Sequence, residues 1–323
     1  MKRVSKLKGS CLALLVVFLT IVLFAPAFLS AYASSQPEIY LTDVDKGRIL
    51  KPYLALFSFK PLIISLDDPR GIACGPDGLL YVAETCEHRI IRFDQHGDYE
   101  EKVVVEKPSS NFKGQPLNLT FGPNGNLFFT TPKKGLWMLE YGDPRNQPEC
   151  LIKGSYFDQD ESLHDLAFLK AGEHTGDLIV SVLTTKPYKG YVLRVPAPDY
   201  NQVRSFVSEY SVEEMGNKIQ NHLRVPVALA VNSIGEVFVA DHEKRENHVL
   251  RYAPNGEFVD IFVESAVNPL DLRFDANDKL YVTLGPLLCG DSEAGGMKVY
   301  DRSGDQEMFI PRRNLWGVAL CED

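Results

Sequence analysis

One short pattern recurs along the chain and limits what it can fold into. A short apolar run, a turn rich in Gly, Asn and Asp, and a second apolar run occur together at 69–84 (PRGIACGPDGLLYVAE) and at 116–131 (PLNLTFGPNGNLFFTT). Related copies follow at 163–182, 225–241 and 268–284, and the first apolar residues of the five copies are spaced by 47, 47, 63 and 43 residues. A period in the forties is typical of stacked or radial repeats.

Each copy has the pattern of antiparallel strands. Apolar residues alternate with small or polar ones at the period of a strand, and the residues between the two runs tolerate the positive φ of a hairpin turn. A third apolar run follows in every copy and a fourth in most; the third runs are 88–94, 135–141, 190–196, 247–253 and 296–302. Four antiparallel strands per repeat predict the blade of a β-propeller.

The two ends of the sequence are predicted to share a blade. Residues 314–323 match only the first strand of a copy, and 38–59 match the remaining strands, since EIYLTDV aligns with LLYVAET. A blade assembled from both ends closes a ring without a free sheet edge. We therefore expect an all-β, six-bladed propeller over residues 36–323. The expected blades span about 67–105, 115–156, 163–211, 225–264, 268–310, and 314–323 together with 38–59.

Residues 1–33 have the pattern of an export signal. Four basic residues precede an apolar stretch from Cys11 to Leu29, and Ala31-Tyr32-Ala33 is a small-x-small cleavage site. The alternative is an uncleaved N-terminal membrane anchor, because the apolar stretch is long for a signal peptide. Either way the propeller is expected to be exported: secreted, or anchored to the membrane and held outside the cytoplasm.

The net charge limits the possible partners, and the cysteines raise the question of a disulfide. The net charge is −9, and it becomes −13 without residues 1–33, which disfavours nucleic acid and anionic membrane surfaces as partners. An odd number of cysteines remains in the propeller: Cys74, Cys86, Cys150, Cys289 and Cys321. Cys74 and Cys321 align one residue out of register on neighbouring inner strands, so we expect two buried thiols there rather than a disulfide. Membrane contact is expected only through residues 1–33.

The first blade resembles an NHL repeat. Pro-x-Gly-Ile-Ala, Pro-Asp-Gly, Leu-Tyr-Val-Ala-Glu and His-Arg-Ile-x-x-Phe-Asp carry the resemblance, over residues 69–94. The same pattern is similar, more loosely, to the gluconolactonase/regucalcin family and to soluble quinoprotein sugar dehydrogenases. These families share the blade and differ in the site, so the resemblance implies the fold more strongly than any activity.

In such propellers the residue after the leading Pro of each blade is expected at the mouth of the central channel. We call these six the mouth positions: Arg70, Leu117, His164, Val227, Leu270 and Trp316. The position after each adds three polar residues: Asn118, Asp165 and Asp271. The candidate ligand-binding residues are Arg70, Asn118, His164, Asp165, Asp271 and Trp316. Arg70 beside the aromatic Trp316 suits an anionic or sugar-like ligand. An alternative is that Arg70 pairs with Asp165 or Asp271 and plugs the channel.

The resemblance also implies enzyme activities, and each needs particular residues that can be looked for at the mouth positions. A gluconolactonase-like hydrolase holds a divalent cation through oxygen ligands, whereas Leu117, Val227 and Leu270 cannot coordinate a metal. A calcium site shifted to the next positions is the remaining metal hypothesis, and catalytic residues are unknown. One histidine, His164, does not make a zinc site. A quinoprotein sugar dehydrogenase would need a basic pocket, for which Arg70 is a starting point.

The favoured hypothesis is therefore a binding module, with a metal-dependent lactonase-type hydrolase as the main alternative. The loop 285–296, with Cys289 and Asp291, is expected to be a recognition loop on the same face. The expected partner is a protein, a glycan or a small anionic or sugar-like ligand. One insertion, 198–223, breaks the period; it is expected to be an elaborated outer strand and connector, or a short helix beginning near Ser211.

Overall fold

The computed structural model describes most of the predicted propeller. The described residues are 37–54, 58–95, 102–105, 114–142, 147–184, 189–207, 210–214, 217–221, 223–242, 247–264, 266, 268–285 and 295–321. Residues 39–321 form one compact unit. The predicted export signal, residues 1–33, lies outside the described residues. Within them, no helix is long and apolar enough to cross a membrane.

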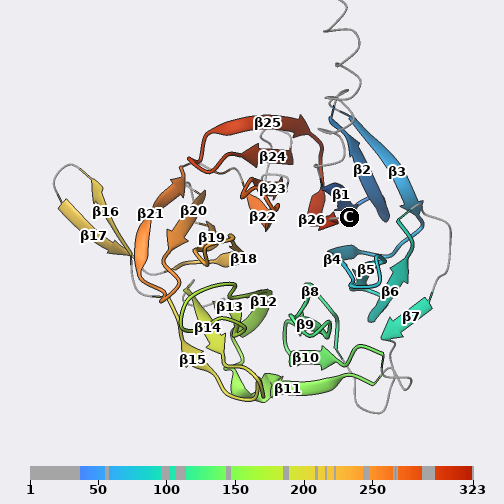
Figure 1. Ribbon diagram of the computed structural model, residues 1–323, viewed down its shortest axis with the longest axis horizontal. Helices are drawn as coiled ribbons and strands as arrows, with labels where there is room; N and C mark the ends of the chain where they lie inside the picture. The colour runs from blue at the N-terminus through green and yellow to red at the C-terminus, as the bar shows by residue number, and fades with distance from the viewer. Residues whose placement is uncertain are drawn as a thin grey trace, which may run out of the picture. The chain divides into compact units, whose positions relative to one another are not determined.

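Six four-stranded antiparallel sheets form the blades of a propeller, and they lie around a common centre in Figure 1. Blade 1 holds β4 (Pro69–Cys74), β5 (Leu80–Glu84), β6 (Arg89–Phe93) and β7 (Lys102–Val105); blade 2 holds β8 (Leu119–Phe121), β9 (Leu127–Thr131), β10 (Gly135–Leu139) and β11 (Glu149–Lys153). Blade 3 holds β12 (Glu161–Phe168), β13 (Leu178–Thr184), β14 (Gly190–Val195) and β15 (Arg204–Ser205); blade 4 holds β18 (Pro226–Val231), β19 (Val237–His242), β20 (Asn247–Tyr252) and β21 (Phe258–Val263). Blade 5 holds β22 (Pro269–Phe274), β23 (Leu280–Leu284), β24 (Gly296–Tyr300) and β25 (Gln306–Pro311). Blade 6 holds β26 (Leu315–Cys321), β1 (Glu38–Asp43), β2 (Arg48–Tyr53) and β3 (Ser58–Ile64). The predicted all-β, six-bladed fold is confirmed.

The hydrophobic core lies between the blades. Six clusters of buried side chains each join two consecutive blades within the described chain. Phe128 of blade 2, for example, packs edge-to-face on Phe168 of blade 3, with ring centroids 5.1 Å apart. Because each strand alternates its side chains between two sheet faces, one blade supplies half of two such clusters. The alternating apolar pattern of each repeat is therefore what closes the ring.

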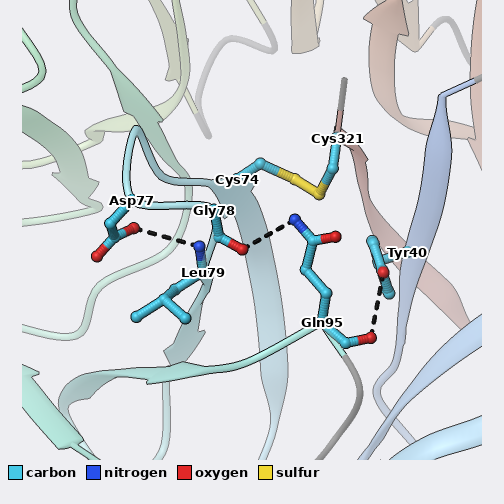
Figure 2. Close-up of a disulfide and its surroundings, with 7 residues drawn as sticks. All are labelled: Tyr40, Cys74, Asp77, Gly78, Leu79, Gln95 and Cys321. Carbon is cyan, nitrogen blue, oxygen red and sulfur yellow. Dashed lines mark hydrogen bonds between the residues drawn. A yellow bond between two sulfur atoms is a disulfide. The ribbon is translucent and has the colours of Figure 1, made fainter. Parts of the chain in front are cut away.

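The sheet that closes the ring has the strand order β26-β1-β2-β3. Its inner strand is also tied to the inner strand of blade 1 by a disulfide between Cys321 and Cys74, whose Cα atoms are 5.6 Å apart (Figure 2). The expectation of two buried thiols is therefore wrong. It treated two strands of adjacent blades as if they were hydrogen-bonded in register, whereas a disulfide needs only a suitable Cα separation.

A side-chain link accompanies this disulfide. Gln95, just after β6, donates its side-chain amide to the carbonyl of Gly78 at 2.8 Å, and its own carbonyl accepts a hydrogen bond from the Tyr40 hydroxyl at 3.3 Å. Figure 2 shows these contacts beside the two cysteines. Tyr40 lies on β1 of blade 6, so two different bonds join blade 6 to blade 1.

The insertion 198–223 contains strands rather than a helix. After the short outer strand β15, β16 (Tyr210–Glu214) and β17 (Asn217–Asn221) pair as a separate two-stranded hairpin, which lies outside the ring of blades in Figure 1. The helix alternative near Ser211 is therefore wrong. The physical reason is the two-residue period, since Val212 pairs with Ile219 across the hairpin.

Candidate functional site

The mouth positions come from the start of each inner strand, where the pairing is irregular. In blade 1, Pro69 pairs with Glu84 but Ile72 pairs with Val82, so two residues of β4 oppose one residue of β5. Similar shifts occur at the starts of β12, β18 and β22. Such bulges break the strict alternation of side chains. The residues after the mouth positions therefore need not face away from the channel, as simple alternation would require.

Three polar or aromatic mouth residues meet across the channel. The guanidinium of Arg70 lies over the Trp316 ring, 4.3 Å from its centroid. The His164 ring approaches Trp316 at 5.9 Å between centroids. Arg70, Trp316 and His164 come from blades 1, 6 and 3, so the contact spans the axis of the propeller. We call these three residues the mouth cluster.

The carbonyls of the same three residues are held by hydroxyls of the preceding blade. Thr42, Thr130 and Thr283 occupy equivalent buried positions on the second strands of blades 6, 2 and 5. The Thr42 hydroxyl donates to the Arg70 carbonyl at 2.7 Å, and the Thr130 hydroxyl donates to the His164 carbonyl at 2.7 Å. The Thr283 hydroxyl donates to the Trp316 carbonyl at 2.5 Å. Each blade thus positions one member of the mouth cluster on the next blade.

His164 is a neutral hydrogen-bonding group in this arrangement. Its Nδ1 lies 2.5 Å from the Val227 carbonyl, which can only accept, so Nδ1 carries the proton and Nε2 is left as an acceptor. Burial lowers the pKa of His164 to about 4, outweighing the opposite effect of that hydrogen bond. The ring therefore stays uncharged at neutral pH.

Arg70 forms its ion pair with a near neighbour. Its Nε lies 3.0 and 2.9 Å from the two carboxylate oxygens of Asp68, which precedes β4. The alternative in which Arg70 pairs with Asp165 or Asp271 is therefore wrong. Asp68 lies only two residues before Arg70 in the chain, and its backbone adopts a positive φ of 51°. The Cys86 thiol contacts the same carboxylate at 3.5 Å.

The residue that does pair with the two buried aspartates is Arg273, which the sequence did not single out. Its Nη1 lies 2.7 Å from Asp271 and 3.9 Å from Asp165. Asp165 is on β12 of blade 3 and Asp271 on β22 of blade 5, so this trio also spans the channel. Arg273 lies three residues after a mouth position, where the other five blades carry Ala or Thr. A comparison of this position among the six blades would therefore have identified Arg273 as unusual.

Burial dominates the electrostatics of the trio. It raises the pKa of Asp271 to about 7 and also raises the pKa of Asp165, while the nearby guanidinium opposes both shifts. Each carboxylate also bonds the inner strand of the next blade: Asp165 accepts from the Leu229 amide at 2.7 Å, and Asp271 accepts from the Val318 amide at 2.9 Å. These aspartates therefore join blades together.

Several polar atoms along the inner strands have no hydrogen-bond partner among the described residues. They include both side-chain heteroatoms of Asn118, Oδ1 of Asp165, Nη2 of Arg273 and Nε1 of Trp316. A buried polar atom without a partner costs about 1–3 kcal/mol, so such atoms mark places where a ligand or water is favoured. Asn118 itself lies on the approach to β8, and its backbone amide donates to the Thr130 hydroxyl that holds the His164 carbonyl.

The described residues do not fit a divalent cation. No group of three or more His, Cys, Asp or Glu side chains among them is arranged to hold a metal. Asp271 is already bonded to Arg273 and to two backbone amides, so its oxygens are committed. Cys289 and Asp291 of the predicted recognition loop lie outside the described residues.

The comparisons with known proteins agree with this architecture. The NHL repeat model matches residues 66–93, which cover most of blade 1. The chain carries an NHL repeat. No curated protein matches its sequence significantly.

Solved structures with the same fold have diverse roles. One is a chain of a nidogen/laminin complex, with 14% identity, a TM-score of 0.62, and coverage of 88% of this chain and 98% of that one. TolB from Acinetobacter baumannii has 13% identity and a TM-score of 0.63, covering 89% and 67%. A gluconolactonase from Xanthomonas campestris has 14% identity and a TM-score of 0.58, covering 85% of each chain. At these identities the similarity concerns the fold alone.

Proposed function

We propose that this NHL-repeat propeller is a protein-binding module that receives an acidic group of its partner at the channel mouth. The observation that carries the proposal is the guanidinium of Arg70 held 4.3 Å above the Trp316 ring. An Arg stacked on an aromatic face and fixed by an ion pair is preorganised to bind a carboxylate.

Two further points support a protein partner. The apolar mouth positions Leu117 and Val227 are buried and offer no metal ligand. The fold is similar to that of a chain whose structure was solved in a nidogen/laminin complex. Glycans and small sugar-like anions share the carboxylate or hydroxyl chemistry of such a site and remain alternative ligands for it.

We also propose that the propeller works outside the cytoplasm. The support is the disulfide between Cys74 and Cys321, because disulfides persist in oxidising compartments. Free-thiol alkylation followed by mass spectrometry of protein isolated from its native cells would test this. Two alkylated cysteines at these positions would contradict export.

The binding proposal can be tested with peptides selected on the immobilised propeller from a random displayed library. We expect the selected peptides to carry an acidic residue or a free C-terminal carboxylate. Arg70→Ala is expected to weaken their binding at least tenfold, whereas Arg92→Ala, on the third strand of the same blade, is the matched control. Binding that is equal for Arg70→Ala and the wild type would overturn the mouth as the site.

The hydrolase alternative needs a separate assay. Purified propeller is incubated with gluconolactone, with and without added Ca²⁺, Mg²⁺ or Zn²⁺. We expect no hydrolysis above the buffer rate. If the propeller hydrolyses gluconolactone in a metal-dependent way, and Arg70→Ala or His164→Gln abolishes this activity, the protein is a lactonase and the binding-module proposal is wrong.

A further inference from the structure

A cavity lies at the other end of the channel from the mouth cluster. It has a volume of about 140 Å³ and is lined by the inner strands of blades 2, 3, 4 and 5. Its lining residues Thr120, Ala167, Ala230 and Arg273 each come three residues after a mouth position. Three residues of extended strand span roughly 10 Å, so the cavity is separate from the mouth.

The lining of this cavity is apolar and basic. Phe121, Phe168 and Phe274 contribute aromatic rings from three different blades. The two charged side chains of the lining, Lys170 and Arg273, are both basic, and no acidic side chain belongs to it. A site of this composition favours a ligand with an apolar body and a negative head group.

Arg273 offers the head-group contact. Its Nη1 is held by Asp271 at 2.7 Å, so the guanidinium is fixed in place. Its Nη2 is buried and has no partner among the described residues. A guanidinium that is already held at Nη1 loses less conformational freedom when it binds a carboxylate oxygen.

We propose that this cavity binds a small carboxylate with a ring-sized apolar body, with the carboxylate on Arg273 and the body against the phenylalanines. The volume fits, since a cavity of about 150 Å³ accommodates benzene. The apolar body gains from leaving water, and the carboxylate satisfies an N–H group that is otherwise unpaired.

Protonation of the two aspartates weakens the opposition to an anion at Arg273. Asp165 and Asp271 share this one guanidinium, and burial raises the pKa of both carboxyls, that of Asp271 to about 7. Near neutral pH a fraction of Asp271 is therefore protonated, which lowers the negative charge beside Arg273, and Lys170 adds a second positive charge to the lining. The described inner strands on either side of β22, which are β18 and β26, contribute no titrating side chain.

Benzoate is the probe, and isothermal titration calorimetry of the purified propeller measures its binding. We expect a dissociation constant on the order of 1 mM or below at pH 6.5. Benzylammonium, which has the same ring and the opposite charge, is expected to bind at least tenfold more weakly. Equal binding of the two, or no benzoate binding at millimolar concentration, would overturn the proposal.

Variants locate the site. Ala167→Leu fills the cavity and keeps Arg273, and it is expected to weaken benzoate binding at least tenfold while the melting curve stays cooperative. Arg273→Gln removes the head-group contact and is expected to do the same. Arg204→Gln, on the outer strand β15, is the matched charge control. If Arg273→Gln does not fold, Ala167→Leu decides alone, and unchanged affinity in it refutes the cavity site.

Discussion

At the scale of single residues, His164 and Asp271 inside the channel should make stability depend on pH in opposite directions. Burial lowers the pKa of His164 to about 4, whereas in the unfolded chain it is 6.5. Between these two pH values the unfolded chain therefore binds a proton at His164 and the native state does not. His164 therefore costs stability as the pH falls from 6.5 towards 4. Asp271, whose pKa burial raises to about 7, gains stability as the pH falls through that value.

Changing His164 to Gln should isolate the first effect. Gln cannot be protonated and can still donate to the Val227 carbonyl. Between pH 7 and pH 5 the wild type is expected to lose about 2 kcal/mol more of its unfolding free energy than His164→Gln. Urea unfolding of both proteins at several pH values measures this. Parallel pH profiles would show that His164 is not kept neutral by the fold.

Arg273 should be far more important for stability than Arg70. Arg273→Ala leaves two buried carboxylates without a counter-charge, and breaking such a pair costs about 3–5 kcal/mol. Arg70 is partly exposed and pairs with one partly exposed carboxylate, so Arg70→Ala is expected to cost less than about 1 kcal/mol. Chemical denaturation of the two variants compares them. The loss in Arg273→Ala should shrink at low pH, where the carboxylates are protonated.

At the scale of strands and blades, the buried hydroxyls of the second strands join neighbouring blades. Thr130→Val keeps the shape of the side chain and removes the bonds to the His164 carbonyl and the Asn118 amide. Leaving these backbone groups unpaired is expected to cost about 1–3 kcal/mol. Thr175→Val, in an exposed turn, is the control and should change stability by less than about 0.5 kcal/mol. Equal melting temperatures for the two variants would show that the Thr130 hydroxyl does not stabilise the contact between blades.

The blade architecture was predictable from the sequence because the same pattern of apolar runs and turn residues occurs in five copies. Alternating apolar residues and Gly-, Asn- or Asp-rich turns define the strands, and each mouth position follows the residue that opens its copy, which is Pro in four blades and Leu in the other two. Arg70, His164 and Trp316 do meet, but the pairing of Arg70 with Asp68 is a local contact that the repeat pattern does not contain. The disulfide and the role of Arg273 depend on how blades are offset across the channel, which a repeat alignment does not contain.

At the scale of the whole molecule, the disulfide joins two inner strands that are 247 residues apart in the sequence. Cross-linking such distant positions restricts the unfolded chain, and losing a disulfide of this kind costs about 2–5 kcal/mol. We expect the double variant Cys74→Ser, Cys321→Ser to fold with a lower melting temperature. Adding a reductant should lower the melting temperature of the wild type and leave the double variant unchanged. An equal drop in melting temperature for both proteins would mean that the reductant does not act through this disulfide.

Deleting residues 314–323 should have a much larger effect than its length suggests. The deletion removes β26, whose Leu315 and Val318 pack in the cluster between blades 5 and 6, while Ala319 and Cys321 pack in the cluster between blades 6 and 1. It also removes Trp316 from the mouth cluster and exposes the edge of β1, which is then free to pair with other chains. Because two of the six interfaces between blades lose their shared strand at once, we expect the ring to unfold as a whole or to aggregate. Size-exclusion chromatography and thermal unfolding measure this, with the double cysteine variant as the control that separates the lost disulfide from the lost strand. A truncated protein that stays monomeric and melts close to that control would mean that the ring holds without its closing strand.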